Sequence, residues 1–72
     1  MQKIFVNGKS TAIEDFIKLF EYDEEFDADN FGACFDTDTF EKAIDSFEGS
    51  YDTFDLVEKY LQLADKPIEV TT

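Results

Sequence analysis

Acidic residues are interleaved with aromatic and aliphatic residues through most of this chain. Its 72 residues include 18 Asp and Glu against 6 Lys, with no Arg and no His, and the formal net charge is −12. Charge of that size opposes a compact state through self-repulsion. Apolar residues nevertheless make up 43% of the chain and include nine Phe, whereas disordered acidic segments are poor in aromatic residues. We therefore expect residues 1–72 to fold as a single acidic, amphipathic domain.

The N-terminal part of the chain predicts a strand, a turn and a helix. Residues 3–6 are typical of a short strand, and the Asn7-Gly8 pair that follows is a turn signal. The next apolar residues have the i, i+3, i+4, i+7 spacing of one helix face, which predicts a helix over 12–21. Thr11 and Glu14 have the spacing of a capping box at its start.

The C-terminal half predicts two further helices and a last strand. The same apolar spacing predicts a helix over 39–48, with Gly49 as the residue that ends it. A third helix begins at Ser50 or Asp52 and stops before the single Pro. Alternating residues over 68–71 indicate a half-buried edge strand.

These elements predict an α+β fold in the order β-α-α-α-β. We expect the terminal strands to pair into a small sheet, with three short acidic amphipathic helices packed on it. Residues 22–35 receive no firm assignment, because their acidic residues and Asn30-Gly32 favour turns while FGACF also suits a short strand. A homodimer is one way to bury the many Phe side chains, since about 70 residues is near the lower limit for folding alone and one Cys forms no internal disulfide.

The residue types argue against several functions. Without His the commonest general base is missing, and without Arg there is no bidentate phosphate recognition. We expect no enzyme activity, no cofactor and no metal site. Direct binding to nucleic acid is disfavoured, because the field repels phosphates. We expect no membrane association, because no segment approaches the roughly 20 apolar residues of a membrane span, and the free thiol suits a reducing cytoplasm.

Helical geometry predicts where the carboxylates gather. At 100° per residue, Asp38, Glu41, Asp45 and Glu48 fall within a sector of roughly 80°, away from the apolar face. The same spacing of acidic residues continues into the third helix. A second acidic block precedes the second helix. The candidate partner-binding residues are Asp38, Glu41, Asp45, Glu48, Asp52, Asp55 and Glu58, together with Glu21, Asp23, Glu24, Glu25, Asp27 and Asp29.

This density of charge is comparable with that of DNA. Duplex DNA carries one phosphate charge per roughly 1.7 Å, so twelve net charges correspond to about 20 Å of duplex. A folded surface of this kind fits a basic groove that otherwise holds DNA, with each carboxylate in place of a phosphate. The sequence therefore predicts a DNA-mimic inhibitor whose partner is a DNA-binding protein or enzyme with a basic groove.

Residues 40–61 contain an acidic helix that ends in an aromatic residue, a Gly-containing turn, a Tyr and a second acidic helix. This order resembles part of the ArdA-type antirestriction proteins, which are longer. The matching positions are Ala43, Phe47, Gly49, Tyr51, Asp52, Thr53 and the helix from Phe54. The resemblance implies a DNA mimic from a phage or mobile element that blocks the DNA-binding site of a type I restriction–modification enzyme in the bacterial cytoplasm.

An acidic surface that serves only solubility, with no mimicry, remains open. Three further alternatives also remain open at this point. The first is a DNA-mimic inhibitor of a CRISPR effector, and the second is an acidic adaptor for a basic protein. The third is a Ca²⁺-binding module, because Asp27, Asp29 and Gly32 match positions 1, 3 and 6 of an EF-hand loop. Position 5 of that loop is Phe31, which has no ligand oxygen in its side chain, and position 12 is Asp38 rather than Glu.

Overall fold

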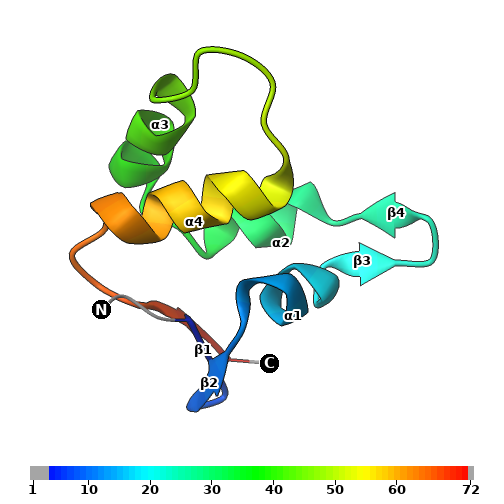
Figure 1. Cartoon of the computed structure of the whole chain (residues 1–72). Helices are drawn as coiled ribbons and strands as arrows, with labels where there is room; N and C mark the ends of the chain where they lie inside the picture. The colour runs from blue at the N-terminus through cyan, green and yellow to red at the C-terminus, as the bar shows by residue number, and fades with distance from the viewer. Residues whose placement is uncertain (1–3, 72) are drawn as a thin grey trace.

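A computed structural model describes residues 4–71 of the chain, so Lys3, the first residue of the predicted N-terminal strand, lies outside the described part. Helices surround a core above a small sheet, and a hairpin projects to one side (Figure 1). The elements are β1 (Ile4–Val6), β2 (Lys9–Thr11), α1 (Ile13–Lys18), β3 (Glu21–Tyr22), β4 (Glu25–Phe26), α2 (Ala28–Ala33), α3 (Thr37–Asp45), α4 (Thr53–Leu63) and β5 (Ile68–Val70). The predicted α+β class is confirmed, and α2 adds a fourth helix to the three predicted.

The terminal strands pair as predicted, within a sheet of order β2-β1-β5. β1 and β5 are parallel, with Ile4 opposite Ile68, and both of these side chains are buried. β1 and β2 are antiparallel and are joined by Asn7-Gly8, whose φ angles of 51° and 82° suit the type I′ turn that this pair favours. The sheet therefore holds the first and last strands, β1 and β5, side by side beneath the helices (Figure 1).

The predicted capping box at the start of α1 is wrong. Thr11 belongs to β2, opposite Ile4, and its hydroxyl donates to the Lys9 carbonyl at 3.0 Å. The N-cap of α1 is Ala12, which makes no side-chain cap hydrogen bond. Sheet pairing takes Thr11 out of the helix, so α1 is shorter than the predicted 12–21.

The unassigned stretch folds into a hairpin and a helix. β3 and β4 have two residues each and are joined by Asp23-Glu24, with Asp23 at a left-handed φ of 56°. Asp is one of the few residues besides Gly that adopt this conformation readily. The following helix, α2, begins at Asp27, whose carboxylate accepts a hydrogen bond from the Asn30 amide at 3.2 Å.

Both C-terminal helices also begin at an Asp. Asp36 caps α3 by accepting from the Thr39 amide at 3.1 Å, and Asp52 caps α4 by accepting from the Asp55 amide at 2.8 Å. Asp52 was one of the two predicted start points for this helix. The end of α3 was predicted wrongly, because its C-cap is Ser46 and Gly49 lies in the connection to α4.

Phe16 lies at the centre of the core and is completely buried. Its ring centroid is 5.3 Å from that of Phe20, 5.7 Å from Phe31 and 6.0 Å from Phe35. Phe35 in turn lies 4.7 Å from Tyr60 of α4, in an edge-to-face arrangement. The Tyr60 hydroxyl accepts a hydrogen bond from the Asp36 amide at 2.9 Å, which ties the start of α3 to the core. A chain of aromatic contacts thus joins α1, α2 and α4.

We expect Phe16→Ala to remove a large part of the free energy of unfolding and to lower the urea midpoint strongly. Phe→Ala in a core costs about 3–5 kcal/mol, and a chain of this length has a total stability on the order of 4–11 kcal/mol. Leu63→Ala is the matched control: Leu63 is 45% exposed, so its truncation should change stability by less than about 0.5 kcal/mol. Urea unfolding followed by circular dichroism measures both. A Phe16→Ala midpoint close to that of the parent protein would contradict this account of the core.

Candidate functional site

The carboxylates lie on the surface. None of the buried residues in the described part of the chain is polar or charged. All thirteen predicted partner-binding residues are exposed except Asp27, which is partly buried. The core therefore leaves every one of these charges available to solvent or to a partner.

The predicted acidic row on the second helix is shorter than expected. Asp38, Glu41 and Asp45 are exposed on α3, but Glu48 lies beyond the Ser46 C-cap and does not share their helix. Seven intervals at 1.5 Å make this row about 10 Å long. Lys42 lies only 40° around the helix from Asp38, so the row also contains one positive charge.

Asp55 and Glu58 form a second short row on α4. Lys59 lies 40° around the helix from Asp55, the same offset that separates Lys42 from Asp38. α4 packs against α3, and the two helices run in different directions (Figure 1). The two rows are therefore separate patches and not one straight stripe.

Two of the predicted binding residues, Asp27 and Asp52, also have a structural role as N-caps. A carboxylate at a helix N-terminus satisfies free amides and interacts favourably with the helix dipole. Asp36 has the same role and was missed as a candidate. The hydrogen bonds from the Thr39 amide and hydroxyl, helped by Lys42 and Lys66, hold the pKa of Asp36 below its ordinary value.

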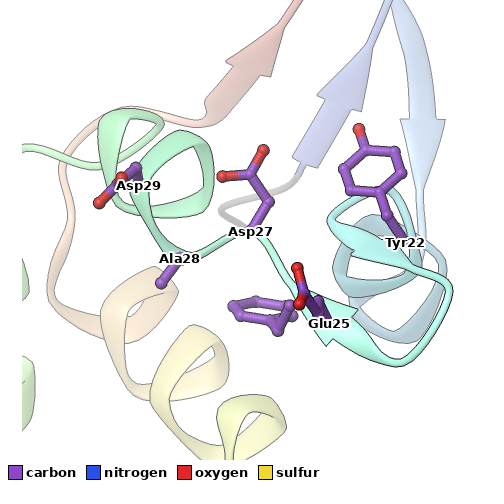
Figure 2. A pocket seen from close by; sticks show the side chains of 6 residues that line it. Tyr22, Glu25, Asp27, Ala28 and Asp29 are labelled. Carbon is purple, nitrogen blue, oxygen red and sulfur yellow. The ribbon is translucent and has the colours of Figure 1, made fainter.

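The second acidic block occupies the projecting hairpin and the start of α2. Cross-strand pairing puts Tyr22 opposite Glu25 and Glu21 opposite Phe26, so each hairpin face combines one aromatic ring with one carboxylate. Tyr22 and Glu25 line a hollow of about 430 Å³, together with the start of α2 (Figure 2). The Asp27 carboxylate in this hollow accepts hydrogen bonds from both the Asn30 amide and the Asn30 side chain.

A second hollow of about 340 Å³ lies between the hairpin, α1 and the start of α4. It brings together carboxylates that are far apart in the sequence, namely Glu14, Glu21 and Asp52. The rings of Phe26 and Phe54 also line it, and they are 39% and 41% exposed. We refer to this surface, lined by Glu14, Ile17, Lys18, Glu21, Phe26, Asp52, Thr53 and Phe54, as the aromatic–acidic groove.

The sequence analysis did not identify this groove. On the helix wheel Phe54 lies roughly 110° from the centre of the face that Leu56, Val57 and Tyr60 bury. Phe54 nevertheless lies three residues before Val57, so the three- and four-residue spacing alone groups it with the buried set and does not indicate that it is exposed.

The EF-hand interpretation has no support in the local geometry. Residues 28–33 are helical, so the segment is not a ligand loop, and the Asp27 side chain caps that helix. Among residues 4–71, no group of three or more His, Cys, Asp and Glu side chains is arranged to hold a metal ion.

Cys34 is partly buried at the end of α2. Its Sγ donates to the Asn30 carbonyl at 3.4 Å, and burial raises the pKa of the thiol. A raised pKa keeps the sulfur protonated, which suits a packing role.

The charge is concentrated at one end of the molecule. Residues 14–58, which form the four helices up to the middle of α4 and the β3–β4 hairpin, contain sixteen acidic residues and two Lys, a net charge of −14. The strands of the sheet lie outside this segment. The molecule measures 31 × 30 × 18 Å, so it is a flat body with its acidic elements on the side away from the sheet (Figure 1).

Comparison of the chain with protein-family models, with curated proteins and with solved structures gives no match. The resemblance of residues 40–61 to the ArdA-type proteins therefore stays a prediction; in the structure this segment comprises most of α3, the connection and most of α4. No helix in the described residues is both long and apolar enough to cross a membrane.

We expect the Asp36 cap to make stability depend on pH. Because the folded-state pKa is lowered, the stabilisation is complete above the unfolded value, near pH 4, and is lost as pH falls through the folded value. Asp36→Ala should therefore melt at a lower temperature than the parent at pH 7, and the difference should shrink below about pH 4. Thermal melts followed by circular dichroism measure this.

Glu41→Ala is the control for this prediction, because it removes the same charge from the same helix without removing a cap. Asp36→Asn should keep the cap but lose its dependence on pH. A gap between Asp36→Ala and Glu41→Ala that stays constant from pH 7 to pH 3 would contradict the cap assignment.

Proposed function

We propose that this protein is a DNA-mimic inhibitor that occupies the DNA-binding groove of a bacterial defence enzyme. The observation that carries the proposal is the net charge of −14 over residues 14–58, displayed on helices and a hairpin with none of the described acidic side chains in the core. A fixed surface of this kind attracts Lys and Arg side chains that otherwise bind phosphates.

The charge density supports mimicry of a short duplex. Twelve net charges along a longest dimension of 31 Å amount to one per about 2.6 Å, against one per roughly 1.7 Å of duplex. The inhibitor is therefore less densely charged than DNA but of the same order. Concentration of the acids at the end opposite the sheet raises the local density further and gives the molecule a preferred orientation in the field of a basic groove.

Residues 40–61 indicate which target to test first. Their resemblance to the ArdA-type antirestriction proteins favours a type I restriction–modification enzyme, and a CRISPR effector is the second choice. In either case the protein acts in the cytoplasm of a bacterial host, where these enzymes meet incoming DNA.

The arrangement in patches implies how binding energy is distributed. The α3 row, the α4 row and the hairpin each present a few exposed carboxylates, and exposed charges contribute individually little in water. We therefore expect affinity to fall stepwise as charges are removed, with no single residue essential.

The first test measures binding to a purified type I restriction enzyme at several salt concentrations, with duplex DNA as competitor. We expect DNA to displace the protein and the affinity to fall on the order of 100-fold between 50 and 200 mM salt. The double variant Asp38→Asn/Glu41→Gln should bind more weakly and with a shallower dependence on salt.

The double variant Asp65→Asn/Glu69→Gln is the matched control. It removes the same amount of charge from outside the acidic segment 14–58, and it should bind almost as the parent does. Equal losses in the two double variants would indicate that net charge alone matters. Binding that DNA does not displace, or that salt leaves unchanged, would refute mimicry.

A second candidate function, an acidic adaptor for a basic protein, is favoured by the exposed aromatic residues, which include Tyr22 at 59% and Phe54 at 41%. Aromatic side chains are enriched at protein–protein interfaces. The same competition separates the two functions, because an adaptor's partner is not released by duplex DNA.

A further inference from the structure

The geometry points to the aromatic–acidic groove as a binding site for an arginine side chain of the partner protein. The inference deepens the proposed function and rests on it for the basic character of the partner. The groove adds a short-range, chemically selective contact to a surface that otherwise attracts any positive charge.

The groove is lined by both apolar and acidic side chains. Ile17 and the rings of Phe26 and Phe54 provide the apolar lining. Glu14, Glu21 and Asp52 provide the acidic lining, and with Lys18 they leave the groove a net charge of −2. A cation that enters therefore meets both carboxylates and ring faces.

Arginine matches this lining better than lysine does. Its guanidinium is planar, stacks on aromatic faces and is more weakly hydrated than an ammonium group, while it still pairs with carboxylates. Arginine is also the residue most often used to bind phosphate, so a DNA-binding groove supplies it.

The two rings differ in what else they do. Phe26 packs against Phe31 of the core, with ring centroids 5.1 Å apart, so its position is fixed from behind. Phe54 lies in the first turn of α4 and none of the described aromatic ring contacts involves it. Phe54 is therefore the ring that can be removed with the least effect on the fold.

Asp52 lines the groove and also caps α4, and its carboxylate can still accept further hydrogen bonds. One oxygen of Asp52 accepts the capping hydrogen bond from the Asp55 amide at 2.8 Å. The second oxygen makes no hydrogen bond within the described residues, and a carboxylate has about four acceptor positions in all. Asp52 thus holds the start of α4 and lends its charge to the groove at once.

The test compares two peptides, nona-arginine and nona-lysine, by calorimetric titration of the whole protein. We expect the parent protein to bind nona-arginine roughly three- to tenfold more tightly than nona-lysine, as a cation–π contribution implies. Phe54→Ala should reduce this ratio while leaving the affinity for nona-lysine and the salt dependence unchanged. Carbon-resolved NMR of the aromatic rings should show the Phe54 signals moving with nona-arginine.

Leu63→Ala is the matched control, because it removes a comparably exposed apolar side chain, 45% exposed, from the opposite end of the same helix. It should keep the parent's preference for arginine. Glu21→Gln should lower the affinity of the protein for both peptides. Unchanged arginine preference in Phe54→Ala, or Phe54 ring signals that do not move, would overturn the inference.

Failure of this inference and failure of the proposed function give different results. If Phe54→Ala still binds the restriction enzyme with parental affinity and DNA displaces it, the mimic stands and the arginine site does not. If the peptides show the Phe54-dependent preference but no DNA-binding enzyme is bound competitively with DNA, the arginine site stands and the mimic does not.

Discussion

The aromatic contacts around Phe16 are the interaction on which the rest of this structure depends. A net charge of −12 opposes folding, because the compact state brings charges of one sign closer together. The opposing free energy comes from the burial of aromatic rings, because each buried ring removes about 150–250 Å² of surface from water. Phe16 of α1 contacts Phe31 of α2 and also Phe35. Phe35 in turn contacts Tyr60 of α4. Within the described part of this 72-residue chain, the core contains no charged side chain, and the buried Tyr60 hydroxyl has a hydrogen-bond partner in the Asp36 amide.

The acidic residues do not only destabilise the fold through charge repulsion; some of them also stabilise it. Asp27, Asp36 and Asp52 each cap a helix, so three carboxylates satisfy amides that the helices would otherwise leave without partners. Their negative charges also lie where the helix dipoles favour them. The Asp residues at the starts of α2, α3 and α4 therefore stabilise these helices and also contribute to the negative charge of the surface. This double use explains how a short chain can be so acidic and still form defined helices.

The sequence was most informative where a regular spacing and a local signal agreed. The apolar periods located α1, α3 and α4, the Asn7-Gly8 pair located the first turn, and the alternation near the C-terminus located β5. The α2 helix and the β3–β4 hairpin were missed because their local residues favour turns, and their conformation depends on packing of Phe26 and Phe31 against the distant core. Thr11 was misplaced for a related reason: pairing with β1 outweighs its capping preference. The exposed carboxylates could be predicted from helical geometry, but the aromatic–acidic groove could not, because it exists only where the start of α4 meets the hairpin and α1.

A surface made only of carboxylates would bind basic proteins broadly, since Coulomb attraction at the surface has little geometric preference and is weakened by salt. Under the proposed function, selection of one enzyme among many basic nucleic-acid-binding proteins requires contacts that act at short range. Exposed Phe54 and Phe26 provide such contacts because a ring selects the shape and hydration of the cation that approaches it. Their position beside Asp52 and Glu21 puts this selective contact within the acidic surface itself. In the proposed function, long-range charge governs how quickly a partner is found, and the groove governs which partner stays bound.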